Sequence, residues 1–156
     1  FGNTTFVFLL FTFLMTYVLE QTPALRRFVA KALGSSFAGK TPWHFIGAFY
    51  TSVLFISLFI SPTILFMIVF PIYEEMMALL GFKKGDRKAS ILLIVLFSTI
   101  AIGTAMTPIN HVFSVTAMAL YKTATGIAIS NAQYMMIGIP AGLVLLELFG
   151  EWICPK

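Results

Sequence analysis

The sequence has little charge for its length. Charged residues make up 10% of its 156 residues, whereas soluble domains carry about 25%. Hydrophobic residues make up 59%, and the mean hydropathy is +0.95. A soluble domain of this size has too little interior to hide so many apolar side chains from water. The sequence therefore predicts an all-α integral membrane protein built from transmembrane helices.

The scarcity of reactive side chains excludes several function classes. Cys154 is the one cysteine, so an internal disulfide is excluded. His44 and His111 are the only histidines, and neither neighbours a cysteine or an acidic residue. No metal-ligand cluster and no acid–base pair for an enzyme is visible. The net charge of +4 comes mainly from two loop clusters and not from a basic face with interleaved aromatics, which argues against nucleic-acid binding.

Turn and charge signals divide the chain into four segments. The chain starts at Phe1 within an apolar context, which predicts a piece of a longer protein. The amphipathic helix of the first segment either lies in the membrane interface or connects two spans in water. The segments are 1–42 (a first span and the amphipathic helix), 43–80 (a re-entrant hairpin), 81–121 (a basic loop and a broken helix) and 122–156 (a last span).

The predicted hairpin is an apolar stretch with a polar break in its middle. No charged residue occurs between Lys40 and Glu74, yet Ser61-Pro62-Thr63 interrupts the run. A capping serine followed by a proline at the first helical position would start a second helical arm. In lipid, non-helical backbone is tolerated only where it is buried in protein or lines a cavity. The break is therefore the first candidate for a site.

A second break lies in the next apolar run. From Ile91 to Tyr121 a single helix would be about 46 Å long, whereas the hydrocarbon core is about 30 Å thick, and Thr107-Pro108-Ile109-Asn110 lies in the middle. Two half-helices joined by a polar loop fit better. Helix N-termini at such breaks attract anions, and helix C-terminal carbonyls suit sodium, as in secondary transporters. The alternative is that both breaks are kinks in ordinary spans.

The basic residues predict the orientation. Lysine and arginine accumulate on the cytoplasmic side of a membrane. The cluster that ends at Lys40 and the cluster at 83–88 lie on the same side only if the hairpin enters and returns there. A re-entrant hairpin and a full transmembrane hairpin both satisfy this condition. We expect the protein in a bacterial inner (plasma) membrane, surrounded by lipid.

The residues at the two breaks resemble the divalent anion:sodium symporter family. The family's hairpin tip carries a Ser-Asn-Thr motif, with another serine four residues earlier and a Pro-Ile pair shortly after. Here Ser57 and Ser61-Pro62-Thr63 are followed by Pro71-Ile72. Ile102 to Ile109 is similar to the family's glycine- and threonine-bearing stretch before its broken helix. The order of span, amphipathic helix, hairpin, broken helix and span also agrees.

The resemblance implies half of an elevator-type secondary transporter. This chain would be most of the first inverted repeat, completed by a second repeat of the same transporter, and the family is usually a homodimer. Family members move dicarboxylates, citrate or sulfate with sodium. By matching position, the sodium ion would be bound by Ser57, Ser61 and Asn110, and the small anionic substrate by Pro62, Thr63 and Thr107.

One departure from the family motif keeps other functions open. Pro62 stands where the family has an asparagine whose amide contacts ion and substrate. A proline has no side-chain amide and no backbone donor. One alternative is therefore a proton-coupled or exchanging anion transporter. Another is a non-transporting membrane scaffold subunit, whose helices pack against a partner.

Overall fold

The computed structural model describes residues 6–7, 10–11, 14, 17–18, 23–34, 38–83, 85–109 and 111–153. Most of the predicted first span lies outside these residues. The described part of the chain is helical and contains no strand. In chain order its elements are α2 (Ala24–Leu33), the 3-10 helix η1 (Ala38–Lys40), α3 (Pro42–Ser57), α4 (Pro62–Leu79), α5 (Arg87–Ala105), α6 (Val112–Thr125) and α7 (Asn131–Ile153).

Three of these helices are long and apolar enough to cross a membrane. They are α4, α5 and the Asn131–Leu148 part of α7. Only 6% of that α7 window is buried inside the chain, so its apolar side chains face outward. In water such a surface would be costly, whereas in lipid it costs nothing. The predicted all-α class is thus confirmed for the described residues, and the three apolar helices support the prediction of a membrane protein.

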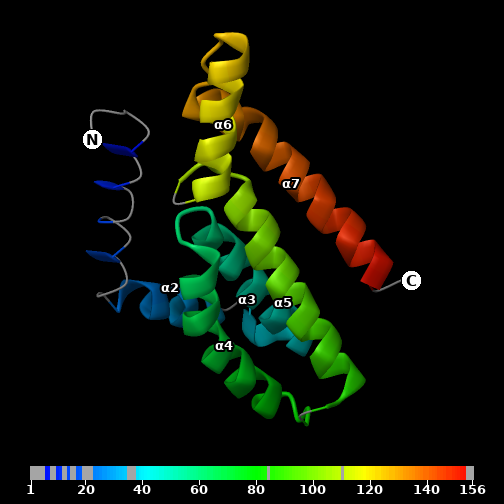
Figure 1. The fold of residues 1–156 in the computed structure, drawn as a ribbon. Helices are drawn as coiled ribbons and strands as arrows, with labels where there is room; N and C mark the ends of the chain where they lie inside the picture. Colours follow the sequence, from blue (N-terminus) through cyan, green and yellow to red (C-terminus); the bar gives the residue numbers. More distant parts are fainter. Residues whose placement is uncertain are drawn as a thin grey trace.

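Helices α3 and α4 form a helical hairpin whose turn runs from Leu58 to Ser61, here called the hairpin turn (Figure 1). At its start, α3 is capped by Thr41, whose hydroxyl accepts a hydrogen bond from the His44 backbone at 3.2 Å. As predicted, α4 starts with Pro62 at its first position. The chain reverses at the break that the sequence marked.

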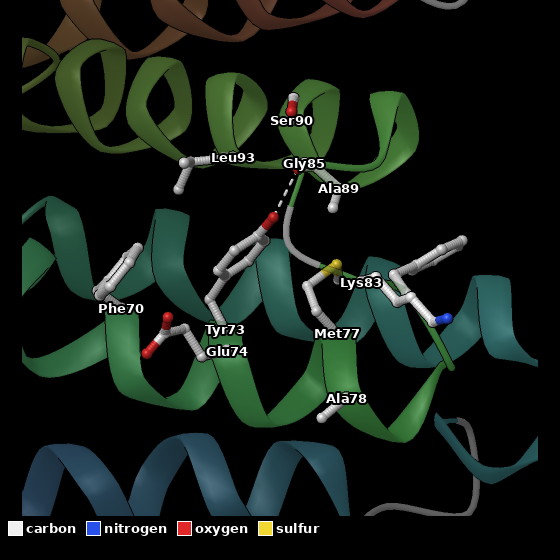
Figure 2. Close-up of a pocket in the computed structure, with 11 residues that line it drawn as sticks. Phe70, Tyr73, Glu74, Met77, Ala78, Lys83, Gly85, Ala89, Ser90 and Leu93 are labelled. Atoms are coloured by element: carbon white, nitrogen blue, oxygen red, sulfur yellow. Dashed lines mark hydrogen bonds between the residues drawn. The ribbon is translucent and has the colours of Figure 1, made fainter.

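Helix α5 lies along the hairpin and is held to both of its arms by tyrosines. The Tyr50 hydroxyl of α3 donates to the Leu92 carbonyl at 2.6 Å. The Tyr73 hydroxyl of α4 donates to the Ala89 carbonyl at 2.6 Å (Figure 2). Both acceptors belong to the first turns of α5. Since each tyrosine body is apolar and each tip is bonded, the ring packs without leaving a buried hydroxyl unpaired.

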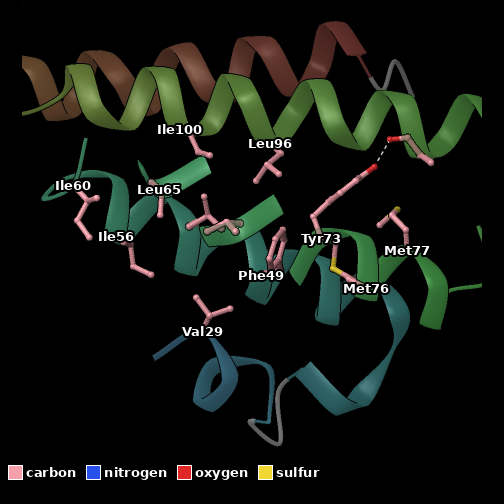
Figure 3. Packing of buried hydrophobic residues seen from close by; sticks show 13 residues of the cluster. Val29, Phe49, Ile56, Ile60, Leu65, Tyr73, Met76, Met77, Leu96 and Ile100 are labelled. Atoms are coloured by element: carbon pink, nitrogen blue, oxygen red, sulfur yellow. Dashed lines mark hydrogen bonds between the residues drawn. The ribbon is translucent and has the colours of Figure 1, made fainter. Parts of the chain in front are cut away.

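A single apolar core joins α2 to the hairpin and to α5 (Figure 3). Helix α2 inserts Val29, and its Phe28 ring stacks on Phe55 of α3 with 5.7 Å between centroids. The amphipathic helix of the prediction therefore packs on the hairpin by its apolar face. The fully buried core positions include Phe49 and Val53 of α3, Leu65 and Val69 of α4, and Leu96 of α5.

The helix break, residues Met106 to His111, separates α5 from α6 at the predicted place. One detail of the prediction is wrong. Helix α5 starts at Arg87, inside the predicted basic loop, so it has 19 residues and is long enough to span a membrane by itself. It is therefore longer than the half-helix that was predicted. Helix α6 has 14 residues, and α7 then returns beside α5, on the side away from the hairpin (Figure 1).

Candidate functional site

The two breaks in the apolar helices meet in space. The Thr107 hydroxyl donates a hydrogen bond to the Leu58 carbonyl at 2.6 Å, across 49 positions of sequence. Thr107 is 1% exposed, and Pro108 beside it is fully buried. Leu58 follows the last residue of α3, where helical carbonyls lose their partners. Thr107 thus satisfies a carbonyl that the end of α3 leaves open.

One helical turn before Thr107, the backbone of α5 comes close to side chains of α3. A Cβ atom added to Gly103 would lie 1.8 Å from the Ser57 Oγ atom and 3.0 Å from its Cβ. Only glycine lets α5 approach α3 so closely. Ser57 is 1% exposed, and its hydroxyl donates to the Leu54 carbonyl of its own helix at 2.6 Å. The hydrogen is therefore engaged, while the oxygen lone pairs still point away from that bond.

The other predicted site residues lie at the start of α4, with one exception. Ser61 is half-buried at the N-cap position, and within the described residues its side chain makes no capping hydrogen bond. Pro62 is half-buried, whereas Thr63 is exposed. Asn110 lies outside the described residues. Of the six, the structure brings Ser57 and Thr107 to the contact between α3 and α5 in buried positions, and leaves Thr63 on the outside.

Helix α7 completes the surroundings of the helix break with a residue that sequence reasoning missed. The Tyr134 hydroxyl lies 3.0 Å from the Ala105 carbonyl and 3.0 Å from the Ser114 hydroxyl. Tyr134 can donate to the carbonyl that ends α5 and accept from the serine in the first turn of α6. The available signal was its position one helical turn before Gly138, on the face that approaches the break.

Two glycines of α7, four positions apart, pack directly on Met106. A Cβ atom on Gly138 would lie 2.6 Å from the Met106 backbone oxygen, and one on Gly142 would lie 2.4 Å from the Met106 Cε atom. The two glycines therefore act as the small-residue contact that their spacing predicts. Their partner is the break itself.

Apart from the His111 ring, the polar side chains named at the two breaks carry hydroxyl groups, and these lie beside backbone carbonyls. Among the residues that the structure describes, no group of three or more histidine, cysteine, aspartate or glutamate side chains comes together. His111, at the N-cap position of α6, has its Nδ1 atom 3.5 Å from the Ser114 hydroxyl. Neutral oxygen ligands of this kind suit a hard cation, and a hydroxyl group can also donate a hydrogen bond to an anion.

Comparisons of the chain with protein-family models, curated proteins and solved structures found no match. The functional inference therefore rests on the meeting of the hairpin turn and the helix break.

Proposed function

We propose that the chain is one half of a secondary active transporter of small anions, with its site where the hairpin turn meets the helix break. The hydrogen bond from Thr107 to the Leu58 carbonyl supports this most directly. It joins two helix interruptions that are far apart in sequence, and transporters build their sites from such interruptions. In this proposal the hairpin is re-entrant, the mechanism is of the elevator type, and the protein is a homodimer in a bacterial inner membrane.

The local chemistry suits an anion together with a cation. Helix α4 starts at the hairpin turn and α6 starts after the helix break, and helix N-termini carry about half a positive charge. The anion would lie near Pro62, Thr63 and Thr107. The cation, sodium in this proposal, would take the Ser57 and Ser61 oxygens together with Asn110. Because Ser57 is covered by Gly103, the hairpin has to shift against α5 before an ion reaches it.

The coupling ion separates two versions of the proposal. Pro62 offers no amide to an ion, so a proton-coupled or exchanging transporter is the alternative. Uptake of labelled succinate, citrate and sulfate into proteoliposomes of the complete transporter, driven by a sodium gradient or by a proton gradient, decides between them. Uptake that needs only the proton gradient, or only internal anion, assigns the alternative.

A matched pair of threonine variants tests the site. Thr107→Val removes the donor to Leu58 and leaves that carbonyl unpaired, at a cost of about 1–3 kcal/mol. We expect uptake to fall by about tenfold or more. Thr99→Val is the control, because Thr99 is also buried but donates only to Val95 of its own helix. Equal uptake by both variants, at equal expression, would show that the helix break is not part of the transport site.

A scaffold subunit is the second candidate, favoured by a different observation. The buried hydroxyls of Ser52, Ser57, Thr99 and Thr104 all donate to carbonyls of their own helices. Satisfied in this way, they need no ligand. In addition, the contact of Gly138 and Gly142 with Met106 is pure packing. A membrane subunit that only holds a partner would show the same features.

Thiol labelling distinguishes the two candidates. With Cys154 replaced by serine, Ser61→Cys and Thr63→Cys place single thiols at the start of α4, and Thr99→Cys gives a buried control. A water-filled transport cavity predicts that a membrane-impermeant thiol reagent modifies the first two and spares the third. If all three thiols stay unmodified in the membrane and react only after unfolding, water does not reach the hairpin turn. That result would favour the scaffold subunit over the transporter.

A further inference from the structure

A cavity lies at the opposite end of α4 from the hairpin turn. It has a volume of about 390 Å³ and is formed by the last turns of α4, the following loop and the first turns of α5 (Figure 2). Its walls are mainly apolar and include Phe70, Met77, Phe82 and Leu93. Cavities of 300–1,000 Å³ with apolar walls and few polar groups are the usual form of small-molecule sites.

The polar groups of this cavity are unevenly placed. Lys83 lines the cavity at the loop end, and Glu74 lines it inside α4, farther from the loop (Figure 2). In sequence, this loop and the start of α5 carry four basic residues and one acidic residue, Asp86. The basic residues are Lys83, Lys84, Arg87 and Lys88. The Asp86 carboxylate accepts a hydrogen bond from the Lys83 backbone at 2.7 Å. The loop end is therefore strongly basic, and its one carboxylate is bonded to backbone.

The position of the cavity relative to the membrane follows from its helices. Both α4 and α5 are candidate spans, and the cavity lies where one ends and the other begins. The loop end therefore lies at headgroup depth, and the apolar walls extend toward the acyl chains. Basic loops predict the cytoplasmic side, where the leaflet carries anionic lipids.

We propose that this cavity binds an anionic phospholipid, a function separate from transport. The phosphate pairs with the Lys83 ammonium group, and one acyl chain lies between Phe70, Met77 and Leu93. Glu74 is displaced along α4 from Lys83, so its charge lies away from the phosphate position (Figure 2). The charge of the loop selects the headgroup, and the apolar walls hold the chain.

Quenching by brominated lipids tests the proposal in the complete protein reconstituted into vesicles. Phe82→Trp puts a fluorophore in the cavity wall, with Trp43 and Trp152 replaced by phenylalanine. Phosphatidylglycerol brominated on its acyl chain should quench this tryptophan at a mole fraction about fivefold lower than brominated phosphatidylcholine, as expected for one lysine contact. Equal quenching by the two lipids would show ordinary lipid contact and overturn the proposal.

Two matched pairs of variants separate the cavity from the general charge of the loop. Lys83→Gln should abolish the preference for phosphatidylglycerol, whereas Lys88→Gln removes the same charge from an exposed residue that does not line the cavity, and should keep it. Ala78→Phe fills the cavity and should reduce quenching by both lipids. Leu79→Phe is its control, because Leu79 is 79% exposed and outside the lining. Equal loss in both lysine variants would assign the effect to surface charge and refute the site.

Competition with unbrominated compounds identifies the kind of anion that the cavity binds. Unbrominated phosphatidylglycerol should relieve the quenching of the F82W tryptophan, and inorganic phosphate should not. Stronger relief by oleate than by phosphatidylglycerol would assign the cavity to a fatty acid and overturn the phospholipid. None of these readouts depends on transport, so failure of the transporter proposal leaves this test intact.

Discussion

Gly103 offers the sharpest test of the packing between the hairpin and α5. Gly103→Ala adds a Cβ atom 1.8 Å from the Ser57 Oγ atom and 3.0 Å from both the Ser57 Cβ and the Leu54 Cδ1 atoms. The hydroxyl has to rotate and give up its bond to Leu54, and the helices have to part by a few tenths of an ångström. Overpacking of this kind costs about 1–3 kcal/mol, against a gain of about 0.5–1 kcal/mol from helix propensity. We expect a net destabilisation of about 1–2 kcal/mol.

Equilibrium unfolding in mixed micelles, followed by tryptophan fluorescence, measures this change. Gly47→Ala in α3 is the control, because nothing lies within 4 Å of its added Cβ atom; it should stabilise the protein. Adding Ser57→Ala to Gly103→Ala should recover about 1 kcal/mol, the share of the clash that involves the hydroxyl. Adding Ser52→Ala should recover nothing. A Gly103→Ala protein as stable as the Gly47→Ala protein would contradict the close approach of α3 and α5.

Two further predictions concern the other contacts of α5 and the break. Gly138→Ala should destabilise more than Gly142→Ala in the same unfolding assay, because the first meets the Met106 backbone oxygen at 2.6 Å and the second meets only side-chain atoms of Met106. Met106→Ala should relieve only the second, and the reverse order of stability would refute the placement of α7. Tyr73→Phe should cost about 1 kcal/mol, because the Ala89 carbonyl loses a side-chain donor at 2.6 Å; an unchanged unfolding midpoint would show that this bond contributes nothing.

Local residue chemistry accounts for the parts of the fold that could be predicted. The start of α4 followed from Ser61-Pro62, because proline presets the backbone of a first helical turn. The helix break followed from a polar, proline-containing stretch in an apolar run that is too long for one span. The length of α5 did not follow, because Arg87 and Lys88 read as loop residues, whereas in the structure they form its first turn.

The candidate site was predictable only in part, for a related reason. Thr107 stood out as a polar residue in an interruption, whereas Ser57 followed only from its place in the family motif that the sequence resembles. The structure buries both. The hydrogen bond from Thr107 to the Leu58 carbonyl could not be predicted, because every residue has a backbone carbonyl and the sequence does not show which one accepts. Tyr134 was missed because its partners, Ala105 and Ser114, lie on two other helices.

By itself, the sequence determined that the chain is apolar enough for membrane-spanning helices and where these helices are interrupted, because hydropathy and proline act over a few neighbouring residues. The tertiary structure decided which interruptions meet. Leu58 and Thr107 are 49 positions apart, and their contact depends on how α5 packs along the hairpin. That packing depends in turn on Gly103 having no side chain. The cavity beside Lys83 has the same origin, since its walls come from α4, the following loop and α5 together.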